Sequence, residues 1–276
     1  MKPIIKWAGG KRQLLPELLK NLPNEFNGTY YEPFFGGGAL FFELEPKVAH
    51  INDINEDLIG LYKVFLHKKE LTKLFNLLDK HEKNHSKDYY YLVRSQDRNK
   101  NYNSNSQVFK AARLIYLNKS CFNGLYRVNS EGHFNVPFNN NKKVNLYEKE
   151  NFLEINDYFS KNTIHISSLD YIDSLNGIKK GDFVYFDPPY DDLANKKSFT
   201  SYSKFGFTKE NQVKLASLFK ELSKKGVYCM LSNHDTELIK SLYSEFNIIK
   251  VKAQRLINSN VKGRKSINEV LIKNYL

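Results

Sequence analysis

The sequence has few of the residues that build disulfide scaffolds, metal centres and membrane spans. Cysteine occurs twice in 276 residues, at Cys121 and Cys229, which is too few for a disulfide framework. The seven histidines are scattered and neither cysteine has the ligand spacing of a zinc site, so we expect no metal. No apolar run reaches the roughly 20 residues of a transmembrane helix. Residues 1–7 do not resemble a signal peptide, so we expect a cytoplasmic protein that does not bind membranes.

Acidic residues are also in deficit. Lys and Arg number 42 against 30 Asp and Glu, which gives a formal net charge of +12. A positive excess favours a polyanionic partner, because basic side chains that neutralise phosphates release counterions. A solvated basic surface has the same composition, so charge alone does not identify the partner. Hydrophobic residues make up 41% of the chain, enough for one compound domain or two lobes.

The spacing of apolar residues predicts an α/β protein with a helical insertion. Short buried strands are predicted at residues 30–32 and 48–52, and further strand-like segments at residues 163–167, 183–187, 227–232 and 269–273. Helical spacing occurs at residues 58–66, 71–78, 108–117 and 208–224. Because strands that alternate with helices usually form a parallel sheet, we expect a parallel sheet whose strands bracket the inserted helices. Polar stretches at residues 99–106 and 139–143 are typical of loops.

A glycine-rich motif follows the first predicted strand. Residues 32–38 read E-P-F-F-G-G-G and precede an apolar turn at residues 39–42. Glycines in such a loop let the backbone approach a ligand closely. The next strand ends at Asp53, whose carboxylate can accept both hydroxyls of a ribose. The motif predicts nucleoside binding, although a structural glycine turn also fits it. The spacing is not G-x-G-x-x-G, which disfavours a nicotinamide dehydrogenase.

A second motif, D-P-P-Y at residues 187–190, directly follows a strand at the sheet edge where open α/β folds bind ligands. The exocyclic amine of a nucleobase is a poor nucleophile, because its lone pair is delocalised into the ring. The Asp187 carboxylate and the Pro188 carbonyl can each accept one N–H and aim the lone pair at an electrophile. Tyr190 offers a stacking face for a base that has left the duplex. A proline turn with an incidental aspartate is the alternative.

Four ordered motifs resemble the Dam and DpnII-type DNA adenine methyltransferases. They are residues 6–11 (K-W-A-G-G-K), 34–38, 52–55 (N-D-I-N) and 187–190. Residues 122–127 (F-N-G-L-Y-R) and 134–138 (F-N-V-P-F) resemble that family's DNA-reading hairpin. The likeness spans nearly the whole chain. It implies a Rossmann-like methyltransferase sheet, formed by residues 1–56 and 161–276, with an inserted, mainly helical DNA-recognition domain. That domain covers residues 57–160 and carries a β-hairpin loop at residues 121–141.

The resemblance also implies a cofactor and catalytic residues. The cofactor is S-adenosylmethionine, which becomes S-adenosylhomocysteine, and the residues implied to line its site are Trp7, Lys11, Phe34, Asp53 and Asp187. The implied catalytic residues are Asp187, Pro188 and Tyr190, with Tyr190 stacked on adenine. The reaction is methylation of adenine N6 in double-stranded DNA by base flipping, and we expect a monomer. Core packing remains the alternative role for Trp7 and Phe34.

For DNA, the resemblance implies the site GATC. It places Lys6 and Arg127 on bases and Leu125 or Phe122 in the duplex beside the target. Asn123 and Pro137 complete the implied DNA contacts. An arginine fork matches guanine O6 and N7, although Lys6 and Arg127 can instead contact phosphate.

Two features of the DNA-contacting regions depart from or extend this pattern. Many GATC methyltransferases have Gly-Arg-Tyr where this chain has Asn139, Asn140 and Asn141, which leaves the reading of the outer bases open. An acid-free basic run is predicted to contact phosphate, or else to form a solvated loop. Its members are Lys250, Lys252, Arg255, Lys262, Arg264 and Lys265.

Two other functions remain open. An N4-cytosine methyltransferase faces the same amine chemistry, although Asp187 at the first position of the motif favours adenine. A catalytically silent DNA-binding module fits the charge and the hairpin, but the intact residues 187–190 and Asp53 argue against it. The sequence does not distinguish an enzyme that acts alone from the partner of a restriction nuclease.

Overall fold

The computed structural model describes residues 1–191, 207–253 and 267–276. The chain forms two compact units. The first consists of Met1–Gly10, Gly36–Glu45 and Asp53–Ser168, and the second of Lys11–Phe35, Pro46–Asn52 and Leu169–Leu276. In these described ranges, no helix has the length and apolar character needed to cross a membrane. Of the predicted basic run, Arg255, Lys262, Arg264 and Lys265 lie outside the described residues.

The described residues contain one mixed sheet of seven strands in the order β3-β2-β1-β4-β5-β7-β6. The strands are β1 (Tyr30–Glu32), β2 (Val48–Asn52), β3 (Thr163–Ser167), β4 (Phe183–Phe186), β5 (Tyr228–His234), β6 (Asn247–Ala253) and β7 (Ile267–Lys273). This sheet confirms the predicted Rossmann-like α/β class. The first three predicted strands have the observed boundaries, and the others agree to within two residues at each end.

The expectation of an all-parallel sheet is wrong at one edge. Strands β2, β1, β4 and β5 are parallel neighbours. Strand β7 runs antiparallel to both β5 and β6. Strand β6 was not predicted, because its lysines were assigned to a basic loop, although polar residues that alternate with apolar ones are typical of a half-buried strand. The apolar pattern of β7 carries no information about strand direction, which depends on how the chain returns to the sheet.

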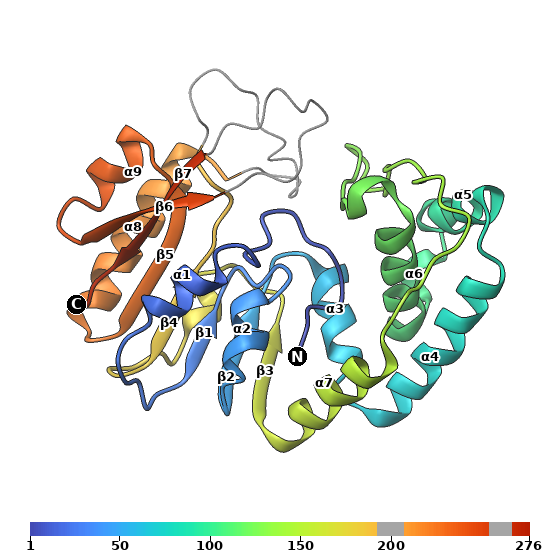
Figure 1. Ribbon diagram of the computed structural model, residues 1–276, viewed down its shortest axis with the longest axis horizontal. Coiled ribbons are helices and arrows are strands. Elements are labelled where there is room, and N and C mark those ends of the chain that lie inside the picture. Colours follow the sequence, from blue (N-terminus) through green and yellow to red (C-terminus); the bar gives the residue numbers. More distant parts are fainter. Residues whose placement is uncertain (192–206, 254–266) are drawn as a thin grey trace. The chain divides into compact units, whose positions relative to one another are not determined.

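The strands of the second unit form a buried core with one long helix. All four residues of β4 are buried, as expected for a strand covered on both faces. Helix α8 (Lys209–Lys224), which confirms a predicted helix, contributes Leu215, Phe219 and Leu222 to the same core. Its first turn is capped by Thr208, whose hydroxyl accepts a hydrogen bond from the Asn211 amide. Shorter helices α1 (Leu15–Lys20) and α9 (Glu237–Leu242) complete this unit (Figure 1).

The order of the strands fixes where a ligand can bind. Strand β1 leads to β2 on one side, whereas β4 leads to β5 on the other, so the sheet order reverses between β1 and β4. Open α/β sheets bind ligands at the carboxyl ends of strands at such a switch point. Phe34 follows β1 by two residues and Asp187 directly follows β4. Two predicted site residues therefore emerge at this position.

The first unit is built around helix α6 (Gln107–Ser120), which packs against α3, α4 and α5. Figure 1 shows α6 flanked by α4 and α5. The other helices of this unit are α2 (Ala39–Leu44), α3 (Glu56–Val64), α4 (Lys68–Lys83), α5 (Lys87–Ser95) and α7 (Lys149–Lys161). The predicted helical segments correspond to α3, α4 and α6. Helices α5 and α7 were not predicted, and the turn expected at residues 39–42 is wrong, because these residues begin α2.

The segment after α6 (residues 121–141) folds back on itself as an irregular hairpin, and we call it the recognition loop after the DNA-reading role predicted for it from the sequence. Two isolated antiparallel bridges join its arms, Cys121 to Phe138 and Val128 to Phe134. A backbone hydrogen bond from Phe122 N to Pro137 O, 2.9 Å long, closes its base. The two bridges make the arms of the loop antiparallel, without a continuous ladder of strand hydrogen bonds.

Candidate active site

The Asp187 carboxylate lies in a buried, charged environment at the end of β4. The Lys11 ammonium is 2.8 Å from Asp187 Oδ1, and both side chains are largely shielded from solvent. Ser232 on β5 donates a hydrogen bond to the same oxygen at 3.0 Å. The Ser232 hydroxyl also forms a hydrogen bond with the Tyr185 hydroxyl at 3.0 Å. Burial raises the pKa of Asp187, whereas Lys11 and the Ser232 hydroxyl oppose that rise. Both donors bind Oδ1, so among the described residues none donates a hydrogen bond to Oδ2.

Tyr190 completes this group in the second unit. Its hydroxyl donates to Glu269 Oε2 at 2.9 Å, and its ring meets His234 edge-on with 4.8 Å between centroids. The Lys11 ammonium lies 4.6 Å from the ring centroid. The structure therefore brings together Lys11, Asp187 and Tyr190, three of the predicted site residues. The hydrogen bond to Glu269 fixes the hydroxyl end of the Tyr190 ring.

Phe34 extends from the switch point onto an aromatic cluster of the second unit. Its ring stacks on Tyr171 with 5.1 Å between centroids and meets Phe207 edge-on at 5.7 Å. Phe34 is only half-buried, so part of the ring remains accessible. A half-exposed aromatic at the carboxyl edge of a sheet fits a purine ring as well as it fits core packing.

In the first unit, Asp53 closes the glycine loop. Its Oδ2 accepts the Gly36 amide at 2.9 Å, and its Oδ1 accepts the Asn55 amide at 2.9 Å. Gly36 has φ +51°, a conformation that other residues rarely adopt. Burial raises the pKa of Asp53, and the two backbone donors oppose that rise. Each oxygen accepts one N–H and keeps a second lone pair, so the carboxylate retains capacity for two hydroxyl donors.

Trp7 connects the glycine loop to the recognition loop within the first unit. A Cβ at Gly36 would lie 3.0 Å from Trp7 Cδ1, so the indole packs directly on this glycine. The Trp7 ring also packs against Tyr126, with 5.0 Å between the ring centroids. The Tyr126 hydroxyl donates to Asp57 Oδ2 at 3.3 Å. Trp7 therefore contacts both the predicted cofactor loop and the segment predicted to read DNA.

Lys6 is held beside the recognition loop by a buried asparagine. Asn118 on α6 accepts a hydrogen bond from Lys6 N at 3.0 Å and donates to Lys6 O at 2.8 Å and Gly124 O at 2.9 Å. Gly124 has φ +66°, and a Cβ there would lie 2.7 Å from Lys6 Cδ. The Lys6 backbone and the start of the recognition loop are thus fixed together, while the Lys6 side chain stays exposed.

The other residues predicted to contact DNA lie on the recognition loop with different exposures. Phe122, Asn123 and Pro137 are exposed, whereas Leu125 is half-buried. Arg127 is half-buried and donates from Nε to Asn135 Oδ1 at 2.6 Å. Phe122, at the base of the loop, is 48% exposed, and an exposed aromatic ring is the kind of apolar group that can enter a duplex.

Several supporting residues gave no signal of their own in the sequence. Ser232 ends a predicted strand and Asn118 follows an apolar helical run, so both resemble ordinary element ends. Asn135 lies inside the F-N-V-P-F motif, but its hydrogen bond with Arg127 joins residues eight positions apart and depends on the loop conformation. Glu269 is far from Tyr190 in sequence. Within the described residues, no three His, Cys, Asp or Glu side chains gather as a metal site.

Comparison with known proteins identifies the family. The family model for D12 class N6 adenine-specific DNA methyltransferases matches residues 7–257. The chain is 44% identical to the type II methyltransferase M1.LlaDCHI of Lactococcus lactis subsp. cremoris, covering 100% of this chain and 96% of that protein. It is 41% identical to the type II methyltransferase M.MjaIII of Methanocaldococcus jannaschii, over 100% and 99%. It is 34% identical to the DNA adenine methylase of Escherichia coli K12, over 98% and 94%. The chain therefore belongs to the D12 class of N6 adenine-specific DNA methyltransferases.

Proposed function

We propose that this protein transfers the methyl group of S-adenosylmethionine to N6 of adenine in duplex DNA, within the sequence GATC. The observation that carries the proposal is the Asp187 carboxylate at the end of β4. Lys11 and Ser232 hold its Oδ1, and since no donor among the described residues binds Oδ2, this oxygen can accept an incoming N–H. The family supplies adenine as the substrate, and the resemblance to Dam and DpnII-type enzymes suggests GATC.

The side chains present fit the proposed cofactor. Asp53 has one lone pair left on each oxygen, which suits the two ribose hydroxyls of a nucleoside. In the first unit Trp7 also offers an aromatic face for an adenine ring. In the second unit Phe34 offers such a face, and the Lys11 ammonium suits a carboxylate. When bound, S-adenosylmethionine supplies an electrophilic methyl group on a sulfonium sulfur.

The protein's own contribution to the reaction is to prepare the amine. Asp187 Oδ2 and the Pro188 carbonyl each accept one N–H of the adenine amine, which withdraws its lone pair from conjugation with the ring. The Lys11 ammonium at 2.8 Å opposes the rise in the Asp187 pKa that burial causes, which favours the ionised carboxylate that accepts this bond and stabilises the positive charge developing on nitrogen. Tyr190, anchored by Glu269, stacks on the flipped base.

We assign recognition of the duplex to residues 57–160, which lie within the first unit. Arg127 donates to guanine O6 and N7, Lys6 contacts a base, and Phe122 or Leu125 fills the space of the flipped adenine, beside Asn123 and Pro137. Asn139, Asn140 and Asn141 replace the aromatic and basic residues of many GATC enzymes, so the outer base pairs rely more on Arg127.

Mapping of methylated bases tests this function. Purified protein is incubated with S-adenosylmethionine and duplexes that carry GATC or each of its single-base variants, and the products are digested to nucleosides. We expect N6-methyladenine in GATC and at least tenfold less in the variants. N4-methylcytosine would instead place the enzyme among cytosine methyltransferases, and methylation of adenine in another sequence would refute GATC alone.

A further inference from the structure

Arg127 is held by its neighbour on the opposite arm of the recognition loop. The Asn135 amide donates to Arg127 O at 3.0 Å, which pairs the two backbones. Arg127 Nε donates to Asn135 Oδ1 at 2.6 Å, and Arg127 Nη2 donates to Asn135 O at 3.3 Å. One asparagine therefore fixes both the backbone position and the guanidinium of Arg127.

These contacts use the hydrogen-bond donors on one edge of the guanidinium, and they do not involve the donors on its end edge. The side edge, formed by Nε and one N–H of Nη2, is bound to Asn135. The end edge still carries one N–H on Nη1 and one on Nη2. A planar guanidinium presents two parallel donors on this edge, which matches a pair of acceptors on guanine. Asn135 thus selects which edge Arg127 offers.

Asn135 is in turn fixed through the residue before it. The Phe134 amide donates to Asp97 Oδ2 at 2.7 Å, and Arg98 Nη2 donates to Phe134 O at 3.0 Å. Asp97 and Arg98 also form an ion pair at 2.6 Å. Both polar groups of the Phe134 backbone are bound, so the arm that carries Asn135 cannot shift without breaking hydrogen bonds.

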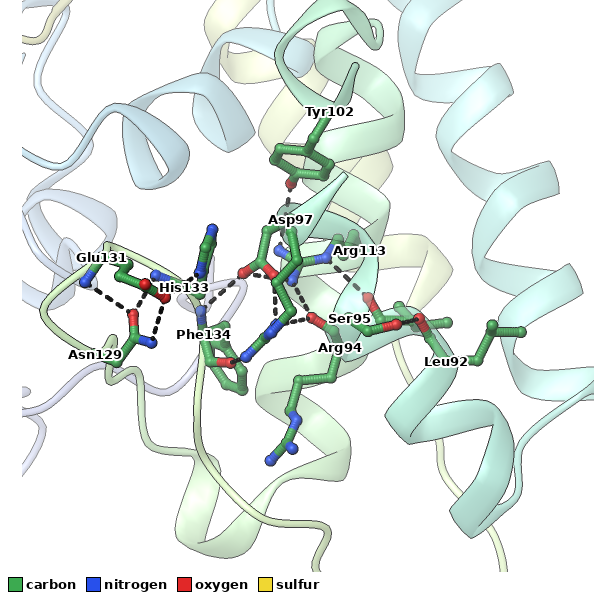
Figure 2. Close-up of polar contacts among 12 residues, drawn as sticks. Leu92, Arg94, Ser95, Asp97, Tyr102, Arg113, Asn129, Glu131, His133 and Phe134 are labelled. Carbon is green, nitrogen blue, oxygen red and sulfur yellow. Dashed lines mark hydrogen bonds and ion pairs between the residues drawn. The ribbon is translucent and has the colours of Figure 1, made fainter. Parts of the chain in front are cut away.

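Asp97 of this pair also forms an ion pair with Arg113, a buried arginine of α6. Arg113 Nη2 lies 2.8 Å from Asp97 Oδ2, and the exposed fractions of the two side chains are 6% and 9% (Figure 2). Arg113 also donates to Val93 O at 3.0 Å and Arg94 O at 2.8 Å, where α5 ends. A buried ion pair stabilises a fold less than apolar packing does, but it specifies one geometry when its hydrogen bonds are satisfied.

We infer that Asn135 is a positioning residue that orients Arg127 for guanine recognition, and that the buried Asp97–Arg113 pair anchors it through the Phe134 backbone. The inference rests on the proposed function, in which Arg127 reads a guanine. It adds a residue that sets base specificity without contacting the base.

The test measures base discrimination by matched variants. For wild type, Asn135→Ala, Asn135→Asp and Arg127→Ala, kcat/KM is determined on GATC and on a duplex whose guanine is replaced. The ratio of the two values reports reading of guanine. Asn129→Ala is the control, because Asn129 lies on the same loop and its side chain accepts hydrogen bonds from the backbone amides of Glu131 and His133, whereas no hydrogen bond between Asn129 and Arg127 occurs among the described residues. The melting temperature of each variant reports folding.

We expect Asn135→Ala to lower the ratio about tenfold, with the melting temperature nearly unchanged. Asn135→Asp keeps an acceptor for Nε and should restore the ratio, and Asn129→Ala should keep it. The double variant of Arg127→Ala and Asn135→Ala should be no worse than Arg127→Ala alone, since the two residues act as one unit. A normal ratio in Asn135→Ala, with a reduced ratio in Arg127→Ala, would overturn the inference and leave the proposed function intact. A wild type that methylates adenine without preference for guanine would overturn both.

Discussion

Replacement of Asn118 by alanine tests how Lys6 and the recognition loop are joined. Asn118 is 1% exposed and makes three hydrogen bonds, two with the Lys6 backbone and one with Gly124 O. A typical intramolecular hydrogen bond contributes about 1 kcal/mol net to stability, and its loss costs more free energy when the former partners stay buried. Asn118→Ala should therefore lower the free energy of unfolding by about 3 kcal/mol.

Urea unfolding at pH 7 measures this loss, provided that the slope of the free energy against urea is the same for both proteins. Asn84→Ala is the matched control. Asn84 is exposed at the end of α4 and its amide donates one local hydrogen bond to Lys80 O, so its replacement should cost less than about 0.5 kcal/mol. A loss for Asn118→Ala below about 1 kcal/mol would refute the idea that this side chain joins the two segments.

Three further predictions concern individual polar groups. Burial lowers the pKa of His81 from 6.5 to about 4, so between pH 4 and 6.5 the unfolded state binds more protons than the folded state. The free energy of unfolding should therefore fall by about 3 kcal/mol as the pH drops from 6.5 to 4, and His81→Phe should abolish this dependence in urea titrations. Asp97→Asn leaves Arg113 buried without its full counter-charge and should cost about 3–5 kcal/mol, so an unchanged urea midpoint would contradict a buried ion pair. Asp53→Ala should weaken S-adenosylmethionine binding at least about tenfold in calorimetry, and equal affinity would remove Asp53 from the cofactor site.

Much of the fold was predictable because its strands are short apolar runs that end in turns. Tyr30–Glu32, Val48–Asn52 and Thr163–Ser167 were predicted with the boundaries that the structure shows. Strand β6 was not, because its lysines were assigned to a basic loop and its pairing with β7 is a long-range property. Helix α2 was mistaken for a turn, since six residues are too few to show helical periodicity.

The site was predictable where one motif carries the chemistry and unpredictable where distant residues meet. Asp187 and Tyr190 stand in one tetrapeptide, but their partners Ser232 and Glu269 come from β5 and β7. Arg127 was predicted from its motif, whereas its hydrogen-bond acceptor Asn135 lies on the opposite arm of the loop. Local propensity does not encode such contacts, because they form only when the whole domain has packed.

Methyl transfer by Asp187→Ala is the most direct test of the proposed mechanism. Single-turnover transfer of labelled methyl from S-adenosylmethionine to a GATC duplex is measured for wild type and variant, with duplex affinity measured in parallel. In the proposed mechanism Asp187 acts on the amine and does not hold phosphate. We therefore predict transfer to adenine N6 by wild type, and at least a 100-fold slower rate for the variant with duplex affinity within about threefold of wild type. Near-normal transfer by Asp187→Ala would contradict the role of this carboxylate in preparing the amine.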